Sequence, residues 1–184
     1  MLYIIIGVII VLAIGIVFIF NQLVGLRQMS ENGWSDIEVQ LKRRADLIPR
    51  LVTTVKGYAS HERGLFEDVT KMRAQTLAAG NNPTARGAAE GAFAKAGGKL
   101  LAIAEDYPDL KASQNFLELQ EELSDTEDKI EMARRFYNGT VRELNTKIQS
   151  VPSNLIAGPF GFKIKDFFEV SAEDAAAPDV EFNA

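Results

Sequence analysis

The residues that could do catalytic chemistry are few in this 184-residue chain, and their spacing matches no catalytic motif. His61 is the only histidine. A zinc-protease helix needs a second histidine four residues further on, and a di-iron helical bundle needs two Glu-x-x-His pairs. We therefore interpret His61 as a residue near the start of a helix. The alternative is a group that changes its protonation at an interface between copies of the chain.

The other candidate groups give no catalytic arrangement either. Cysteine is absent, which excludes disulfides, thiolate chemistry and cysteine-ligated metals. Gly97-Gly98-Lys99 is too short for a phosphate-binding loop and lacks the strand that precedes such a loop. We therefore predict no catalytic residue, no metal, no cofactor and no enzymatic activity. The acidic residues of the later part of the chain are interpreted as a solvated helix face: Glu118, Glu121, Glu122 and Asp125.

The basic cluster Lys42-Arg43-Arg44 has two interpretations. It is either one polar face of a helix, paired with Glu38 and Asp46, or a contact with anionic lipid headgroups or an acidic surface of a neighbouring copy. The chain as a whole has a formal net charge of −5 and no dense basic stripe. Nucleic acid is therefore not a predicted partner.

The segment from Leu2 to Phe20 carries no charged residue, and the first charge is Arg27. As an α-helix it spans about 29 Å, which matches the roughly 30 Å hydrocarbon core of a bilayer. A cleavable signal peptide would need a basic start and a small-residue cleavage site, and a buried core helix would need a larger protein around it. We predict that residues 1–26 are a single transmembrane anchor, with membrane lipids as partners.

The charged residues that follow the anchor indicate on which side of the membrane the C-terminal domain lies. Arg27 lies close to the apolar segment, and Lys42, Arg43, Arg44 and Arg50 lie further along the chain. An excess of Lys and Arg marks the cytoplasmic side of a membrane segment. We expect the C-terminal domain to be cytoplasmic.

Two long segments carry a helical repeat of apolar residues. The first is expected over residues 21–58, directly continuous with the anchor, with a kink but not a stop at Pro49. Arg44 occupies the one polar position of its apolar stripe. The second is expected over residues 112–151. We predict that the two helices face each other through the following core residues: Trp34, Ile37, Leu41, Leu51, Leu119, Leu123, Ile130 and Tyr137.

Two shorter helices are expected between the long ones. The first would run over residues 61–79 with Ser60 as its cap, and the second would reach residue 106 with Thr84 as its cap. Small residues fill the second, which makes it either closely packed or weak and mobile. The predicted fold class is all-α: a transmembrane helix that continues into an elongated antiparallel bundle of three to four helices over residues 27–151.

After Pro152 the apolar period changes from helical to two, which predicts a short strand or extended segment over residues 152–170. Residues 171–184 are acidic and rich in alanine, and we expect them to be disordered. The large apolar side chains of the extended segment either cover the end of their own bundle or contact a neighbouring copy. Our hypothesis is the second, an oligomer contact through Phe160, Phe162, Ile164, Phe167 and Phe168.

Three stretches of the chain resemble the LemA family. They read WSDIEVQLKRRADLIPRLVTTVKGYASHE over residues 34–62, EDYPDLKASQNFLELQEELSDTEDKIEMARRFYN over residues 105–138, and PSNLIAGPFGF over residues 152–162. The chain departs from the family pattern at Arg50, where many relatives carry Asn, and at Gly33, where Ala is common. The resemblance implies a membrane-anchored, all-helical bacterial protein without established enzymatic activity. Magnetosome-associated relatives suggest a role in shaping or organising membranes.

These observations predict a scaffold protein of the bacterial membrane that associates with copies of itself. One alternative is a tethered adaptor that recruits a protein partner, such as a membrane protease. Another is an enzyme whose catalytic groups are shared between chains. The absence of a catalytic motif within the chain favours the scaffold.

Overall fold

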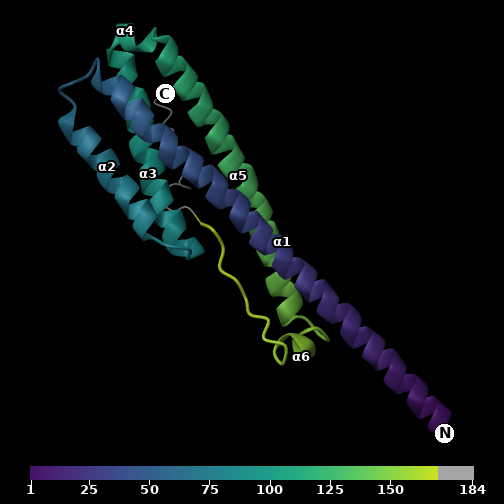
Figure 1. The fold of residues 1–184 in the computed structure, drawn as a ribbon. Helices are drawn as coiled ribbons and strands as arrows, with labels where there is room; N and C mark the ends of the chain where they lie inside the picture. The colour runs from purple at the N-terminus through teal and green to yellow at the C-terminus, as the bar shows by residue number, and fades with distance from the viewer. Residues whose placement is uncertain (170–184) are drawn as a thin grey trace, which may run out of the picture. The chain divides into compact units, whose positions relative to one another are not determined.

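The computed structural model describes residues 1–169, and the regular structure of this part is entirely helical (Figure 1). No strand is present among these residues, so the all-α fold class is confirmed and a strand after Pro152 is not found. The prediction of an extended segment over residues 152–170 is wrong at residues 154–157, which form a short helix. The predicted disorder of residues 171–184 lies outside the described residues. The helices are α1 (Leu2–Lys56), α2 (Arg63–Ala78), α3 (Pro83–Ile103), a 3₁₀ turn (Ala104–Asp106), α4 (Pro108–Lys111), α5 (Gln114–Gln149) and α6 (Asn154–Ala157).

The helix α1 is 55 residues long and continues without a break from the apolar segment into the amphipathic one. The predicted continuity is therefore confirmed. Pro49 lies inside this helix and does not end it, as expected. The chain divides into two compact units whose boundary falls within α1 and within α5. Unit 1 comprises residues 1–37 and 132–167, and unit 2 comprises residues 38–131 together with Phe168 and Glu169.

Unit 1 pairs the first part of α1 with the second part of α5. Leu23 of α1 and Leu144 of α5 are fully or almost fully buried and share a small core with Ala157 and Phe162. The Trp34 and Tyr137 rings, both predicted core residues, pack with their centroids 5.5 Å apart. The core of this unit therefore combines two helices with the chain that follows α5.

Unit 2 contains the larger core. It is formed by the later part of α1, α2, α3, the 3₁₀ turn, α4 and the first part of α5. Its buried residues include three that were predicted to face one another: Leu51, Leu119 and Leu123. Ile37, Leu41 and Ile130, also predicted as core, are buried as well.

The two predicted helix caps are wrong. The helix α2 begins at Arg63, and the preceding residue makes no capping hydrogen bond through its side chain, so Ser60 is not its cap. The helix α3 begins at Pro83, and the side chain of Asn82 accepts the 2.9 Å hydrogen bond from the backbone N–H of Ala85. Proline suits the first position of a helix because it has no N–H to satisfy there. The Asn-Pro pair thus places the cap two residues before Thr84.

The small residues of α3 allow close packing, as the first of the two alternatives for this helix expects. A Cβ atom built on Gly97 would lie 3.1 Å from the Cδ1 atom of Ile48 in α1. A Cβ atom on Gly87 would overlap the backbone carbonyl of Glu169. The last described residues therefore lie against α3 of unit 2, where Phe168 is 1% exposed.

We predict that Gly87→Ala destabilises unit 2, because the added methyl group and the Glu169 backbone cannot occupy the same space. Overpacking of this kind costs about 1–3 kcal/mol in the free energy of unfolding. The measurement is denaturant unfolding of the full-length protein in detergent, followed by circular dichroism. Gly98→Ala is the matched control, because a Cβ atom there meets nothing within 4 Å. We expect it to stabilise α3 by up to about 1 kcal/mol. Equal effects of the two substitutions would contradict the close approach.

Candidate functional site

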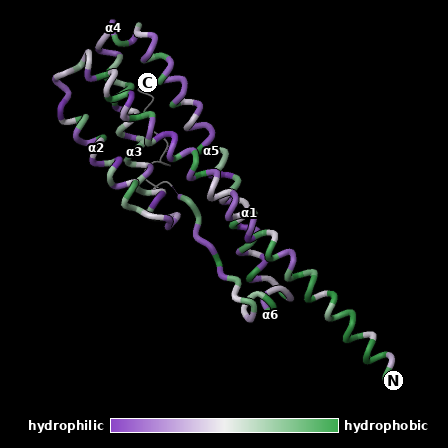
Figure 2. The backbone as a smooth tube through the Cα atoms, viewed as in Figure 1, coloured by the Kyte–Doolittle hydropathy of each residue, from purple (hydrophilic) through white to green (hydrophobic). Residues whose placement is uncertain are grey.

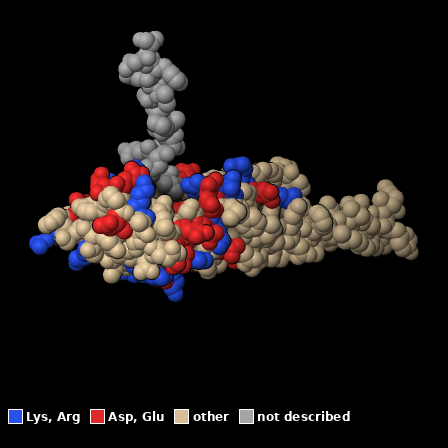
Figure 3. Space-filling view, turned by 90° about the horizontal axis from the view of Figure 1, so that it is seen from above, with Lys and Arg blue, Asp and Glu red and all other residues tan. Residues whose placement is uncertain are grey.

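The apolar part of α1 is the first functional feature. Among the described residues, α1 is the one helix that is long and apolar enough to cross a membrane, and none of its most apolar window is buried. The large side chains from Leu2 to Phe18 are exposed. Figure 2 shows the hydrophobic colour continuing along this part of the helix, and in Figure 3 no charged side chain appears on it. The composition and exposure fit a membrane-spanning segment.

Aromatic contacts mark the point where this apolar run ends. The Phe20 ring packs edge-on against Phe160 and Phe162, with centroid distances of 5.1 Å and 5.7 Å. Gly161, between these two residues, has a φ of 74°, a backbone conformation that residues with side chains rarely adopt. The turn at Gly161 thus allows both rings to contact Phe20.

The first charged residue of α1 contacts the same aromatic cluster. The guanidinium carbon of Arg27 lies 5.4 Å from the centroid of the Phe162 ring, a cation–π distance. The Phe162 side chain is buried, with 7% of its surface exposed. The cation nearest the apolar run therefore stacks on a ring of the segment that follows α5.

Polar contacts hold residues 162–167, which are extended, against the helices of unit 1. The side-chain amide of Asn145 donates to the backbone carbonyl of Lys165 and accepts from its backbone N–H, both at 2.8 Å. The Tyr137 hydroxyl donates to the Asp166 carbonyl at 2.9 Å. Burial, and then the charge of the Asp166 carboxylate, raise the pKa of Tyr137 to about 12. The Asn145 amide supplies the pair of hydrogen bonds that a neighbouring strand would supply, so the segment is extended without a sheet.

The residues of the predicted oligomer contact have different surroundings. Phe162 is buried in unit 1, and Phe168 is buried in unit 2. Phe167 is half-buried. Phe160 and Ile164 remain exposed, at 57% and 61% of their surface. Of the five, these two side chains leave most of their surface exposed.

A buried ionic cluster lies in unit 2, and sequence analysis did not find it. Arg44 of α1 is 3% exposed and donates through one guanidinium nitrogen to both Glu127 carboxylate oxygens, at 3.0 Å. Its other terminal nitrogen lies 2.6 Å from the Glu90 carboxylate, which is also buried and receives a second hydrogen bond from Arg86 at 2.9 Å. The Arg44 guanidinium also stacks near the Phe93 ring at 5.9 Å. Two cations and two anions balance, as a buried cluster requires.

This cluster corrects the interpretation of Lys42-Arg43-Arg44 as one polar face. Lys42 and Arg43 are exposed, whereas Arg44 points into the core. The position of Arg44 within an apolar stripe was the available signal. The position of Glu90 gave no such signal in the sequence, because Glu90 lies among the small residues of another helix.

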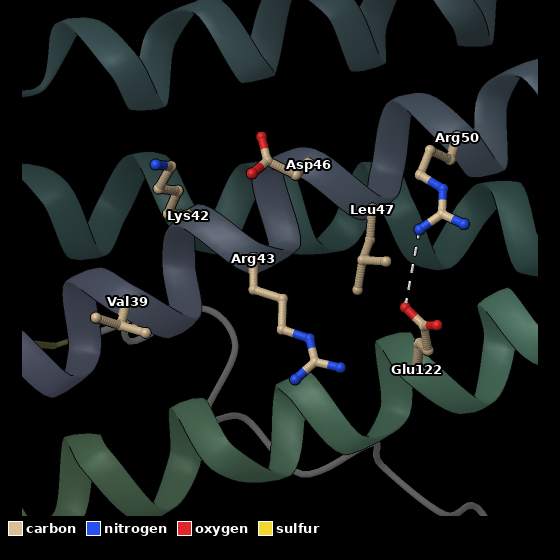
Figure 4. Close-up of a pocket in the computed structure, with 7 residues that line it drawn as sticks. All are labelled: Val39, Lys42, Arg43, Asp46, Leu47, Arg50 and Glu122. Atoms are coloured by element: carbon tan, nitrogen blue, oxygen red, sulfur yellow. Dashed lines mark ion pairs between the residues drawn. The ribbon is translucent and has the colours of Figure 1, made fainter.

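An open depression of about 340 Å³ lies beside the exposed members of the basic cluster (Figure 4). In it, an Arg50 guanidinium nitrogen lies 4.0 Å from a Glu122 carboxylate oxygen, a distance at the limit of an ion pair. Lys42 and Arg43 have no ion-pair partner in the described part of the chain. The depression is lined by Val39, Lys42, Arg43, Asp46, Leu47, Arg50 and Glu122.

Within residues 1–169, no group of His, Cys, Asp and Glu side chains could hold a metal ion. His61 is exposed in the turn before α2, where its carbonyl accepts a hydrogen bond from the Arg63 N–H at 2.9 Å. The charged groups that do converge, around Arg44, form ion pairs with one another, and the Arg44 Nε atom is left without a hydrogen-bond partner among these residues. The features that remain for function are apolar and basic surfaces.

Comparison with known proteins gives a family and several relatives. The LemA family model matches residues 33–182. Magnetosome protein MamQ 2 of Paramagnetospirillum magneticum is 25% identical over 82% of this chain and 64% of its own length. Magnetosome protein MamQ of Magnetospirillum gryphiswaldense is 25% identical over 81% of this chain and 64% of its own. Protein LemA of Metamycoplasma hominis is 28% identical over 74% of this chain and 63% of its own. The chain thus spans slightly less than two thirds of the length of these relatives.

Proposed function

Because the chain belongs to the LemA family, we propose that it is a non-enzymatic scaffold, fixed in the bacterial membrane by α1 and assembled from several copies. The family relationship supports the non-enzymatic part of the proposal. The magnetosome relatives support a role at a membrane, and through them we propose that the scaffold helps to shape or organise that membrane.

One observation supports the proposed membrane anchor most directly. The exposed apolar run of α1 belongs to the same helix as fully buried core residues. Leu23 and Ile37 are not accessible to solvent, whereas the side chains before Ile19 are largely exposed. A continuous apolar surface of this size is unfavourable in water and favourable in a bilayer. Arg27 follows the run on the side of the folded units, and we propose that these units are cytoplasmic.

Exposed apolar side chains on unit 1 support self-association. Phe136 and Met132 are exposed one turn apart on α5, and the Phe136 ring lies over Gly33 of α1, where a Cβ atom would come within 3.0 Å of it. Ile164, from the predicted oligomer contact, is exposed in the same unit. Apolar surfaces of a membrane-tethered protein associate readily, because tethering raises their local concentration.

The test is the mass of the full-length protein in mild detergent, measured by light scattering with the detergent contribution subtracted. We expect a multimer for the natural sequence and a smaller species for Phe136→Ser combined with Ile164→Ser. Leu77→Ser, at an exposed leucine of α2 in unit 2, is the matched control and should leave the mass unchanged. A monomeric natural protein would refute self-association.

The depression in unit 2 favours the adaptor as a second candidate. Its lining residues include three cations and two anions, and Lys42 and Arg43 make no ion pair there, which suits an acidic segment of a protein partner. Crosslinking in native membranes separates the two functions. The scaffold predicts mainly crosslinks between copies of this chain, whereas the adaptor predicts crosslinks to another protein that Lys42→Glu combined with Arg43→Glu removes.

A further inference from the structure

The end of α5, the helix α6 and the segment after it pack around α1 at the end of its apolar run. We call this part, residues 144–165, the collar. Leu144, Ala157 and Phe162 of the collar form a core with Leu23 of α1, and Ile19 and Phe20 pack against that core. The collar therefore begins to cover α1 at the last residues of the apolar run.

The contacts of Phe20 fix the depth of the collar relative to a bilayer. Phe20 is the last residue of the apolar run, and the Phe160 ring lies 5.1 Å from it in edge-on contact. A bilayer that covers the apolar run up to Phe20 also reaches Phe160. The outer surface of the collar then lies at the boundary between acyl chains and headgroups.

The surface of the collar is apolar at this level. Val151 is 77% exposed and Leu155 is 71% exposed, on either side of the start of α6, and Phe160 follows at 57%. Figure 1 shows α6 beside α1 in unit 1, and Figure 2 shows hydrophobic colour in this part of the chain. Three large apolar side chains on a short surface segment are unfavourable in water and suit the interfacial region of a bilayer.

The charge of the collar differs in sign from that of the whole chain. Residues 144–165 contain Lys147, Lys163 and Lys165 and no Asp or Glu, whereas the chain has a net charge of −5. Lys165 pairs with Glu31 at 3.4 Å. Lys147 and Lys163 make no ion pair within the described residues. Basic side chains that flank an apolar surface fit the anionic phosphates of lipid headgroups.

We propose that the collar is a second lipid contact, which docks on an anionic bilayer surface beside the segment of α1 that crosses it. Val151, Leu155 and Phe160 enter the interfacial region, and Lys147 and Lys163 bind phosphate groups above it. The inference rests on the proposed membrane anchor. It adds that unit 1 lies on the bilayer instead of being separated from it by a linker.

The absence of cysteine makes the test direct, because any introduced cysteine is a unique labelling site. Full-length Leu155→Cys, carrying an environment-sensitive fluorophore, is reconstituted into phosphatidylglycerol vesicles with a quencher attached to the upper acyl chain. Met29→Cys is the matched control: an exposed apolar residue of α1 in the same unit, outside the collar. Val8→Cys reports on α1 itself, where this valine is exposed.

We expect the labels at residues 8 and 155 to lose most of their emission to the quencher and the label at residue 29 to keep it. If the label at residue 8 is quenched and the label at residue 155 is not, the collar proposal is wrong and the anchor stands. If neither is quenched, the anchor fails as well. A label at residue 155 that is shielded from water but unquenched, and that changes with protein density, would assign the patch to a second copy and overturn the proposal.

The charges are tested separately with Lys147→Gln combined with Lys163→Gln. In phosphatidylglycerol vesicles we expect this variant to lose part of the quenching at residue 155. In phosphatidylcholine vesicles we expect the same quenching with and without the substitutions. Unchanged quenching in phosphatidylglycerol would overturn the assignment of the two lysines to phosphate.

Discussion

Leu123→Asp is expected to abolish the folded state of unit 2. Leu123 is 6% exposed and belongs to the core that joins α1, α2, α3 and α5. Removing a buried leucine side chain costs about 2–5 kcal/mol, and burying a carboxyl group without a partner adds about 1–3 kcal/mol. The sum is comparable to the whole stability of an ordinary domain, about 5–15 kcal/mol.

The measurement is thermal unfolding of the full-length protein in detergent by circular dichroism, combined with limited proteolysis over residues 38–131. We expect no cooperative transition for unit 2 and rapid cleavage. Leu117→Asp is the control, because Leu117 lies on the same helix and is 45% exposed. Asp near the start of a helix is tolerated well, so the control should change stability by no more than about 0.5 kcal/mol. A cooperative transition close to that of the natural protein would show that Leu123 is not a core residue.

Arg44→Ala is expected to give the second-largest effect. The substitution leaves the buried Glu90 carboxylate with one of its two ion-pair partners, Arg86, and opens a cavity beside Phe93. Breaking a buried ion pair by removing one partner costs about 3–5 kcal/mol. For a chain of this size we expect a decrease in Tm of about 10 °C.

Two variants identify the cause of that loss. Arg43→Ala removes the same side chain one residue earlier, at an exposed position, and should have little effect. Arg44→Met combined with Glu90→Met removes the two buried charges, and we expect it to recover most of the lost stability. The charges that lose a partner, on Arg86 and Glu127, are on side chains that solvent can reach. Failure of the double variant to recover stability would mean that the cluster contributes through hydrogen bonds to the backbone, such as Arg44 to the Glu90 carbonyl.

The helical architecture could be predicted from the sequence because its determinants are local. The apolar stripe keeps its helical phase on both sides of Pro49, and α1 continues through this residue. The partners of Arg44 could not be predicted in this way. Glu90 is 46 positions away in the sequence, and no periodic pattern relates the two residues.

The aromatic segment shows a different limit of sequence reasoning. The alternation of Phe160, Phe162 and Ile164 predicted an extended backbone, but a pattern with period two does not specify which face is covered. The structure buries Phe162 against Leu23 and leaves Phe160 and Ile164 exposed. Which of these side chains is buried depends on the turn at Gly161 and on the shape of α1, and both are properties of the folded chain.

The pairing of Asn145 with Lys165 also closes one position at which the same segment of another copy could pair. An extended backbone with free donors and acceptors is a template on which identical chains stack into fibrils. Here the Asn145 amide side chain is hydrogen-bonded to both backbone groups of Lys165, so a strand from another chain cannot pair at that residue. We therefore expect copies that meet on a membrane not to pair their backbones at Lys165.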